Sequence, residues 1–535
     1  MCVKTSLAAL TALAAAVLAG CTASYENRYM TMDVPAEKLR TVETFDASAM
    51  SAPETPAPAE PSAEALTSTE TALSLEQCRA AALENNLDLK VVLVDPAIAA
   101  EAVNQAEAVF EPSLSSDLTY TVIDPAVPEG VRGAQSESLS SGLGFGFPLR
   151  TGGLLTFDMP VTRFEENPSG YGSAVSASLS QPLLRGAGVR ANTYDIRIAR
   201  YQSQVSQAQT KLEVMRVIAA VDRVYWRLYA ARREVEVRKN EYDLAVAQLE
   251  RARRRVQAGA ASEVEVIRAE TGVAERVEAI ITSGNTLRQR ERDLKRSLNA
   301  PRLEMDSPTA IVPSTEPNPV HYSFDAARLV KAAAENRMEM LALELQIAQD
   351  ASTIDLRRNQ TLPALALAYT YAVNGVGPAA ADSFDLLQDK RFENHSVGLS
   401  LELPLGNAAA RSRLRQAIAS RIQRLATRDQ RRAQIEQEVL DAVDQLETSW
   451  QRVLANRQRT ILAARNVDAE TRQFELGLRT STEVLDAQTR LADAQSAEIS
   501  SLTDYQIAQV DLAYATGTLL GEARVRWAPA PIEGK

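Results

Sequence analysis

Residues 474–487 read Phe-Glu-Leu-Gly-Leu-Arg-Thr-Ser-Thr-Glu-Val-Leu-Asp-Ala, and a related stretch lies 218 positions earlier in the chain. That earlier stretch, residues 256–269, reads Val-Gln-Ala-Gly-Ala-Ala-Ser-Glu-Val-Glu-Val-Ile-Arg-Ala. The two share a glycine (Gly259 and Gly477), a later Glu-Val pair and a final alanine. Glycine ends helices because it takes the left-handed backbone conformation without steric cost. Each stretch is therefore predicted to turn one helix into the next, in a chain that contains one unit twice.

The repeat extends over most of the chain. A shift of 251 positions pairs Glu84-Asn85 with Glu335-Asn336, and a shift of 222 positions lays Pro182 on Pro404. Each unit is predicted to run helix, strands, very long helix, break and long helix. We expect a first repeat over 73–300, a linker over 301–322, a second repeat over 323–521 and a tail over 522–535. The helical hairpins are expected over 184–298, with the turn near 259, and over 408–520, with the turn near 477.

The long segments carry apolar residues at alternating steps of three and four. These are Val214, Val217, Val221, Val224, Leu228, Ala231 and Val235 in the first repeat, and Ile435, Val439, Ala442, Leu446, Trp450 and Val453 in the second. The spacing averages that of a left-handed coiled coil. Residues 190–257 would form a helix about 100 Å long at about 1.5 Å per residue. A soluble coiled-coil scaffold would carry the same stripes, so the helices alone do not separate it from a channel.

The segments between the helices alternate apolar and polar residues. The apolar ones are Leu114, Leu118, Tyr120 and Val122; Leu365, Leu367, Tyr369, Tyr371 and Val373; and Val397, Leu399, Leu401, Leu403 and Leu405. We expect strands over about 113–181 and 364–405. About ten residues of such alternation are typical of transmembrane β-strands, although a half-buried soluble sheet alternates as well. One chain supplies too few strands to close a barrel, so several copies would have to close it together.

The strand region of the first repeat is longer than that of the second. Residues 138–162 alternate too, around a turn-like stretch from Pro148 to Gly153. This hairpin either extends beyond the other strands or joins the barrel. The chain would then supply four or six strands, and the residues leave both alternatives open.

The N-terminal residues have the pattern of an export signal. Lys4 precedes a short apolar run that ends Leu18-Ala19-Gly20-Cys21. The run is too short to span a bilayer, and small residues before a cysteine are typical of lipoprotein signal peptides. We predict that residues 1–20 are a signal peptide and that Cys21 carries the lipid anchor, with palmitate among its acyl chains. Residues 21–72, rich in Pro and Ala, are predicted to be a tether.

Composition argues against several classes of protein. A net charge of −11 leaves no basic footprint for nucleic acid. Two histidines, and only Cys78 after Cys21, argue against a His/Cys metal site and a disulfide framework. There is no phosphate-binding Gly-rich loop, no paired zinc histidines on a helix and no Cys-x-x-Cys. We therefore expect no catalytic residue, no cofactor and no metal, and an inert thiol at Cys78.

From residue 73 to 521 the sequence resembles the TolC-like outer-membrane efflux protein family, most specifically over 474–487 and its partner 256–269. The segment from Gln181 to Gly186 is similar to the strand-to-helix exit of one branch of that family. The resemblance implies a mostly α fold, in which three copies share one transmembrane β-barrel and their hairpins form an α-barrel through the periplasm. It favours about four barrel strands from each copy, whereas the alternation of residues 138–162 argues for six. The resemblance also implies a periplasmic adaptor (membrane fusion) protein at the tips and an inner-membrane pump that supplies the energy. Such a duct serves tripartite efflux or type I secretion and hydrolyses nothing.

The resemblance assigns roles to residues at the two turns. Gly259, Ser262, Gly477 and Thr480 match the tips that meet the adaptor. Glu483 and Asp486, three apart on one helical face, match acidic residues that ring the narrowest point of the tunnel. Three copies would bring six carboxylates around the axis and attract cations. An ordinary solvated helix face is the alternative.

The resemblance also implies a latch that holds the resting tunnel shut. Arg479 matches the family's basic residue and Glu265 its acidic partner, so we expect an Arg479–Glu265 latch. Phe474 stands where the family has a tyrosine. It lacks the hydroxyl, so we expect a weaker closed state.

Two other function classes compete with the duct. A periplasmic coiled-coil scaffold lipoprotein would conduct nothing, and it would have no use for strands that alternate in phase. An envelope enzyme would need a site, and no motif provides one. The strands therefore favour an outer-membrane exit duct in a Gram-negative bacterium, for a cargo and a class of pump that no motif identifies.

Overall fold

A computed structural model describes residues 70–123, 136–165, 169–523 and 525 of the chain. The predicted signal peptide, Cys21 and nearly all of the predicted tether lie outside the described residues. The end of the tether is a correction, because strand β1 (Glu70–Leu73) pairs in parallel with β6 (Ala310–Pro313) inside the predicted linker. The side chain of Ile311 is fully buried and Leu73 packs against the same core. Burial of these apolar side chains stabilises both strands.

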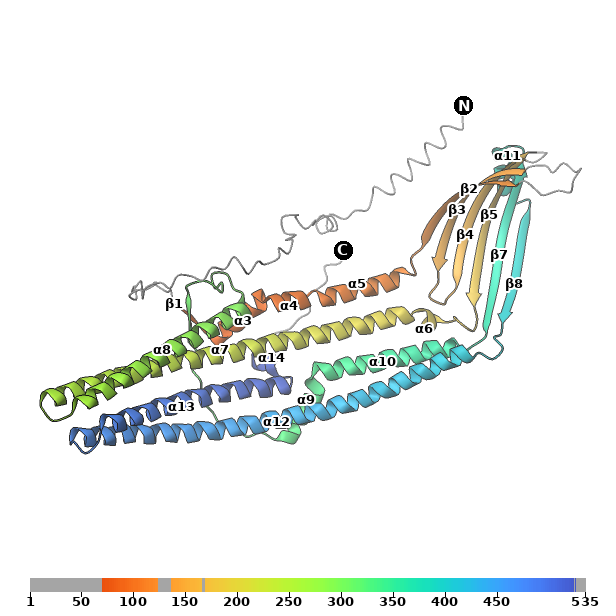
Figure 1. Cartoon of the computed structure of the whole chain (residues 1–535). Helices are drawn as coiled ribbons and strands as arrows, with labels where there is room; N and C mark the ends of the chain where they lie inside the picture. Colours follow the sequence, from red (N-terminus) through yellow and green to blue (C-terminus); the bar gives the residue numbers. More distant parts are fainter. Residues whose placement is uncertain (1–69, 124–135, 166–168, 524, 526–535) are drawn as a thin grey trace, which may run out of the picture. The chain divides into compact units, whose positions relative to one another are not determined.

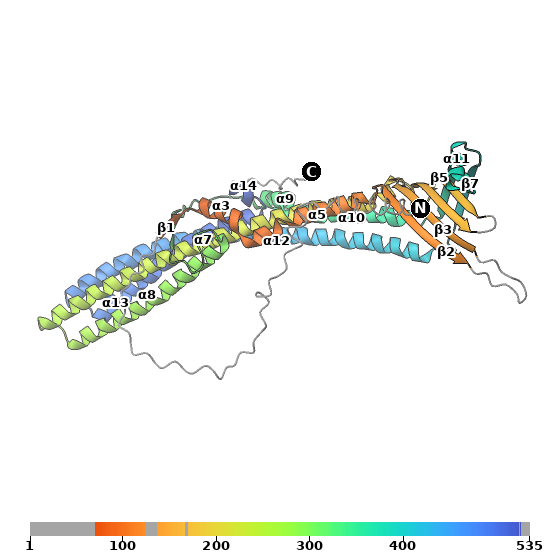
Figure 2. The ribbon, with the colours of Figure 1, turned by 90° about the horizontal axis from the view of Figure 1, so that it is seen from above.

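Two long helical hairpins dominate the fold (Figure 1). Helix α7 (Tyr194–Gln257) turns into α8 (Glu263–Leu298), and α12 (Ala408–Glu475) turns into α13 (Ser481–Ala515). Helix α7 packs against both α8 and α13. The hairpins therefore lie side by side with their turns at the same end, as two views agree (Figures 1 and 2). Across the part of the chain that the structure describes, no helix combines the length and apolar character needed to cross a membrane.

The predicted apolar stripes are the packed faces of these helices. Val214, Val217, Val221, Leu228 and Ala231 are buried in α7, with Val224 and Val235 half-buried. In α12 the buried members are Ile435, Val439, Leu446 and Val453. The helices form because the stripes bury apolar surface against their neighbours, in the way coiled-coil seams do.

Shorter helices follow a similar order in both halves, and all of them except α11 pack along the long ones. They are α3 (Leu75–Asn85), α4 (Leu87–Val92), α5 (Asp95–Ala108), α6 (Val189–Asn192), α9 (Ala326–Asn336), α10 (Met338–Asn359), α11 (Ala380–Gln388) and α14 (Leu519–Glu522). Helices α3, α4 and α5 contact α7, and α9 and α10 contact α12. Helix α10 also contacts α7, which joins the two halves a second time.

The largest core gathers side chains from both halves: α3, α4, α7, α8, β6, α13 and α14. Cys78 is fully buried there, and burial, together with nearby Asp222, raises the pKa of its thiol to about 12. The thiol is thus protonated at neutral pH and unreactive. Asp222 is also fully buried and accepts two hydrogen bonds from the Arg79 guanidinium, at 2.8 and 2.7 Å. This ion pair fastens α3 to α7.

The other strands of the described residues form one six-stranded antiparallel sheet. Its order is β2-β3-β4-β5-β7-β8. The strands are β2 (Ser113–Ile123), β3 (Ser136–Pro148), β4 (Leu154–Glu165), β5 (Gly170–Pro182), β7 (Ala364–Gly377) and β8 (Glu393–Glu402). The first and second halves of the chain therefore meet at the β5–β7 pair, with Val175 opposite Val373.

The additional hairpin of the first repeat is part of this sheet. β3 and β4 pair with each other and lie between β2 and β5. The turn between them is held at the base of the sheet, where Thr151 donates its hydroxyl to Gln181 at 2.8 Å and its carbonyl accepts the Gly188 N–H at 3.0 Å. The described sheet therefore has six strands and not the four that the resemblance favours, because this hairpin alternates in phase with its neighbours and pairs with both.

The register places apolar side chains of all six strands on one side of the sheet, called here the apolar face. Its members are Leu114, Leu118, Tyr120, Val122, Leu139, Leu143, Phe145, Phe147, Leu155, Phe157, Met159, Val161, Val175, Ala177, Leu179, Leu365, Leu367, Tyr369, Tyr371, Val373, Val397, Leu399 and Leu401. The opposite side, the polar face, carries mainly Ser, Thr, Asn, Gly and Ala, together with the carboxylates Asp117, Asp158 and Glu402. Alternation along a strand puts successive side chains on opposite faces, so one register sorts the whole sheet.

Helix α11 packs against β5 and β7 at the end of the sheet far from the long helices (Figure 1). The hydroxyls of Ser173 and Ser383 lie 2.6 Å apart and are buried. A Cβ at Gly375 would lie 1.9 Å from the Ser383 carbonyl oxygen, so only glycine admits the helix this close. Helix α11 therefore covers the end of the apolar face at this pair of strands.

Candidate functional site

The two predicted turns have the same backbone geometry. Gly259 and Gly477 are both left-handed, with φ of 70° and 78°. At each turn the glycine N–H and the next N–H bond back to carbonyls of the preceding helix. In the first turn these bonds run from Gly259 to Val256 at 2.9 Å and from Ala260 to Arg255 at 2.8 Å. This pair of hydrogen bonds is the glycine C-cap that satisfies the last helical carbonyls.

Each turn ends on a hydroxyl residue that starts the returning helix. Ser262 accepts the N–H of Val264 at the start of α8. Thr480 starts α13 with a capping box, in which the Glu483 carboxylate accepts the Thr480 N–H at 2.7 Å. A capping box satisfies N–H groups that a helix start leaves free. The four predicted tip residues are thus the residues that build the two turns.

Glu265 connects the two hairpins at this end. Its carboxylate, on α8, accepts the backbone N–H of Ser481, the first residue of α13, at 3.0 Å. A carboxylate at a helix N-terminus is favoured by the free N–H groups and the helix dipole. Partial burial acts to raise the pKa of Glu265, but the Ser481 N–H and hydroxyl and the Arg268 guanidinium outweigh it and lower the pKa. The charged form therefore holds the contact.

Arg255 and Phe474 form a second connection between the hairpins. The guanidinium carbon of Arg255 lies 4.7 Å from the centroid of the Phe474 ring, which is only 3% exposed. The same guanidinium donates to the Phe474 carbonyl oxygen at 2.8 Å. The aromatic ring therefore binds a cation by its face instead of donating a hydroxyl. Phe474 was singled out from the sequence, but Arg255 was not, because nothing in the sequence relates two residues so far apart.

Within one chain, Arg479 has other partners than the expected Glu265. Within the described chain its guanidinium contacts Glu470 at 3.2 Å and Glu483 at 2.6 Å, and both lie on its own hairpin. Glu265 instead pairs with Arg268 at 3.1 Å and with the Ser481 N–H. The predicted Arg479–Glu265 ion pair is not formed within one chain, because nearer partners one helical turn away satisfy both groups.

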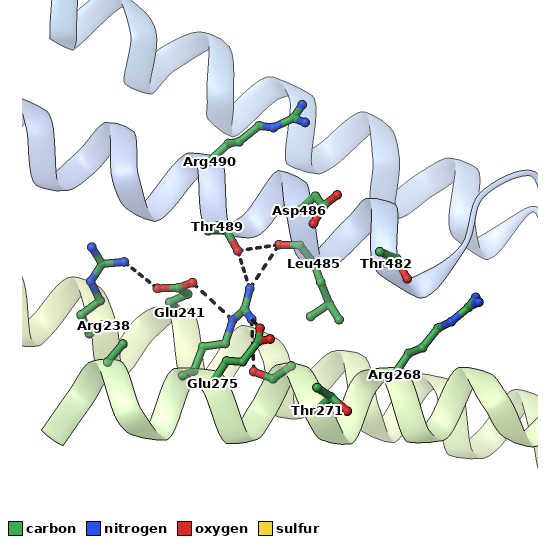
Figure 3. Close-up of a pocket in the computed structure, with 13 residues that line it drawn as sticks. Arg238, Glu241, Arg268, Thr271, Glu275, Thr482, Leu485, Asp486, Thr489 and Arg490 are labelled. Atoms are coloured by element: carbon green, nitrogen blue, oxygen red, sulfur yellow. Dashed lines mark hydrogen bonds and ion pairs between the residues drawn. The ribbon is translucent and has the colours of Figure 1, made fainter. Parts of the chain in front are cut away.

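Glu483 and Asp486 differ in their surroundings. Glu483 is half-exposed, caps α13 and pairs with Arg479; the Thr480 N–H, followed by the Arg479 side chain, lowers its pKa. Asp486 is exposed and lies on the wall of a cleft of about 750 Å³ between the hairpins (Figure 3). The cleft also contains Arg268 and Arg490, so both signs of charge line it.

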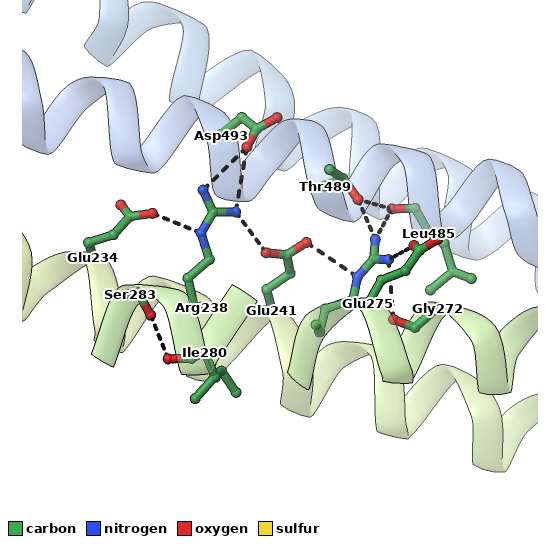
Figure 4. Close-up of polar contacts among 11 residues, drawn as sticks. Glu234, Arg238, Glu241, Gly272, Glu275, Ile280, Ser283, Leu485, Thr489 and Asp493 are labelled. Atoms are coloured by element: carbon green, nitrogen blue, oxygen red, sulfur yellow. Dashed lines mark hydrogen bonds and ion pairs between the residues drawn. The ribbon is translucent and has the colours of Figure 1, made fainter. Parts of the chain in front are cut away.

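An ion-pair network in the wall of this cleft joins α7, α8 and α13 (Figure 4). Arg276 is 7% exposed, contacts Glu241 at 3.3 Å and Glu275 at 2.8 Å, and donates to the Thr489 hydroxyl. Glu241 also pairs with Arg238 at 3.0 Å. Nothing in the sequence pointed to this network, since charged residues at helical spacing are usually solvated. Among the described residues, no group of His, Cys, Asp and Glu is arranged to hold a metal ion.

Comparison with known proteins identifies a family. Residues 162–300 and 329–518, more than half of the chain, match the family described as outer membrane efflux protein. The outer membrane protein TolC of Salmonella enteritidis is 26% identical over 212 residues, which are 38% of this chain and 42% of TolC. TolC of Escherichia coli (strain K12) is 25% identical over 201 residues, which are 36% and 40% of the two chains. The chain thus spans about two fifths of the length of the curated relatives it matches.

Solved structures share the fold at lower identity. A membrane protein from Pseudomonas aeruginosa has a TM-score of 0.64 at 20% identity, over 83% of this chain and 93% of that chain. The CmeC outer membrane channel of Campylobacter jejuni has a TM-score of 0.62 at 15% identity, over 83% and 86%. At these identities the likeness concerns the fold.

Proposed function

The chain belongs to the outer membrane efflux protein family, and from that premise we propose that it is the outer-membrane exit duct of a tripartite efflux or type I secretion system. In this proposal three copies of the chain close one β-barrel in the outer membrane, and their long hairpins form the tunnel below it. The duct is passive and has no catalytic residue, so energy comes from the pump.

The observation that carries the proposal is the apolar face of the sheet. It is continuous over six strands and largely exposed: Leu118 is 66% exposed, and Val397, on the opposite edge strand, is 72% exposed. Soluble monomers rarely expose contiguous apolar patches of this extent. Strands of 10 to 14 residues also suit the thickness of a bilayer. Acyl chains are the environment that such a surface fits.

The polar face supports a water-filled interior. It carries small hydroxyl residues and glycines. Its two aspartates, Asp117 and Asp158, lie opposite Gly142 and Gly144 of the neighbouring strand β3. A Cβ at Gly142 would lie 2.5 Å from the Asp117 carboxylate, and one at Gly144 would lie 3.0 Å from the Asp158 carboxylate. The glycines thus leave room for two carboxylates on the face that would line the lumen. Polar-in, apolar-out alternation is characteristic of outer-membrane barrels.

The hairpin tips are proposed as the periplasmic gate. Gly259, Ser262, Gly477 and Thr480 build the turns that would meet a periplasmic adaptor protein, next to an inner-membrane pump. The Arg255–Phe474 and Glu265–Ser481 contacts support a closed state within each chain. We keep Glu483 and Asp486 as the proposed acidic ring, although the pairing of Glu483 with Arg479 leaves Asp486 as the freer charge.

The proposed site of action is the outer membrane of a Gram-negative bacterium. Cys21, outside the described residues, is the proposed attachment point for the lipid that anchors the chain. The pattern from Leu18 to Cys21 and the apolar face of the sheet support the same membrane from independent parts of the chain.

Conductance of the purified protein in planar bilayers tests the function. We expect discrete cation-selective openings whose selectivity, read from the reversal potential, falls in Glu483→Gln/Asp486→Asn. Glutamine can still serve in the capping box, so α13 keeps its start. Asp117→Asn/Asp158→Asn is the matched control, since it removes the same charge from the sheet and should change selectivity less. If the control removes the selectivity and the tip variant does not, the acidic ring lies in the barrel instead.

The second candidate is the periplasmic coiled-coil scaffold, which the packed helical stripes alone would also suit. Properly folded protein that never inserts into bilayers and never yields a heat-modifiable trimer on gels would favour the scaffold over the duct.

A further inference from the structure

Among the residues that the structure describes, the sheet ends in two free edges, β2 and β8. Both are outermost in the strand order, and every residue of each is exposed. Soluble proteins protect such edges with lysine, proline or bulges. Neither strand contains lysine or proline, and the pairing of each with its neighbour continues without a bulge. Acyl chains cannot satisfy the backbone groups of an edge, so a membrane sheet must have another strand there.

The directions of the two edges fit each other. Every pair in the sheet is antiparallel, so with six strands β2 and β8 run in opposite directions. The β2 edge of one copy can therefore meet the β8 edge of another in the antiparallel arrangement used throughout the sheet. An odd number of strands would instead bring two parallel edges together.

The faces of the two edges also fit. The apolar face contains even-numbered residues of β2, such as Leu118, and odd-numbered residues of β8, such as Val397 and Leu399. Pairing that sets Leu118 opposite an odd-numbered residue of β8 continues the apolar face from copy to copy. A slip of one residue would turn the polar residues of one strand towards lipid.

The strands β3 and β4 are full members of the sheet in every respect. The partners of Leu143, Phe145 and Phe147 on β4 are Met159, Phe157 and Leu155, all on the apolar face. Phe147 and Phe157 also make an edge-to-face contact with centroids 5.9 Å apart. Strands β3 and β4 separate β2 from β5. The β2 edge therefore lies two strands farther from β5 than it would in a sheet without this hairpin.

We propose that β2 of each copy pairs with β8 of the next copy, and that the homotrimer closes into a barrel of eighteen strands from three six-stranded sheets. This inference rests on the proposed channel function and specifies its barrel. Barrel diameter grows about linearly with strand number, so this barrel is about half as wide again as one lacking β3 and β4. The exit is thus wide enough for an aqueous channel of porin size.

Cysteine pairs across the proposed seam test it in the membrane-embedded full chain. Leu118→Cys is combined in turn with Val397→Cys, Leu399→Cys and Leu401→Cys, and the membranes are oxidised. A disulfide forms only when the two Cα atoms come within about 7 Å. We expect covalent trimers on denaturing gels for at least one combination. The control, Leu118→Cys with Gly398→Cys, places the two thiols on opposite faces and should not link.

Electron cryomicroscopy of the purified trimer is the second measurement, with eighteen strands expected. Conducting trimers in which no combination links, or whose barrel has fewer strands, would overturn the seam while leaving the duct standing. Protein that neither inserts nor conducts would overturn the duct and the seam with it.

Discussion

At the scale of single residues, the tip of the molecule shows how one substitution changes the chemistry of a contact. Phe474 has no hydroxyl to donate, yet its ring is buried under Arg255, whose guanidinium also donates to the Phe474 carbonyl. A cation over an aromatic face and a charged hydrogen bond together contribute on the order of 1–3 kcal/mol. The missing hydroxyl would weaken the closed state, whereas the contact with Arg255, which only the structure revealed, stabilises it.

Arg255→Ala should destabilise the closed tip. Loss of about 1–3 kcal/mol corresponds to roughly a 5- to 150-fold shift towards the open state, which single-channel open probability measures. Arg254→Ala is the matched control, because it removes an exposed arginine from the same turn. Arg479→Ala should have the smaller effect, since its partners lie on its own hairpin. Equal open probabilities for the Arg255 and Arg254 variants would refute the role of this contact.

Glu265 makes the closed tip sensitive to acid. Its pKa is lowered in the folded chain, so its contribution is complete above the ordinary value of 4.5 and is lost as pH falls through the lowered pKa. Open probability should therefore rise as pH falls below about 4.5. Glu265→Gln should weaken this acid response, whereas Glu263→Gln, an exposed neighbour, should retain it. An unchanged response in the Glu265 variant would contradict the assignment.

At the scale of elements, local chemistry predicted the helices, strands and turns. Apolar periodicity gave the long helices, and glycine gave the turns at 259 and 477, because both signals act over a few residues. The expected helix over 190–257 is found as α6 and α7, with an interruption at Thr193. The short strands β1 and β6 were missed because four residues are too few to show a period.

Gly477→Ala should destabilise the second hairpin by about 1–2 kcal/mol, because alanine is strained at a φ of 78°. The opposite effect on stability is expected for Gly284→Ala within α8, because a Cβ added there would have no atom within 4 Å. Alanine should stabilise that helix by up to about 1 kcal/mol. Thermal loss of the helical circular-dichroism signal compares the two variants. A Gly477 variant as stable as the wild type would mean that the left-handed turn is not needed.

At the scale of the whole molecule, the two halves are held together in one core. The ion pair of Arg79 and Asp222 joins α3 to α7, two of the helices that supply this core together with α13 and α14. Breaking a buried pair is more costly than replacing both partners, because a lone buried charge stays behind.

Arg79→Leu should therefore destabilise the fold by about 3–5 kcal/mol. The double variant Arg79→Leu/Asp222→Leu should recover most of that loss, because no unpaired charge remains in the core. Urea unfolding followed by circular dichroism provides the comparison. A double variant no more stable than Arg79→Leu would show that the cost comes from packing and not from the buried carboxylate.

The amino-acid sequence determined which segments are helices or strands, which side of each is apolar and where the chain turns. These properties depend on neighbouring residues and on their period, so they can be read without knowing the fold. The tertiary structure decided which distant residues meet: Arg255 with Phe474, Glu265 with Ser481, Arg276 with Glu241, and the additional hairpin with both halves of the sheet. Such pairings depend on how helices rotate and strands order when they pack, and several partners of suitable charge lie within reach of each group until packing selects one.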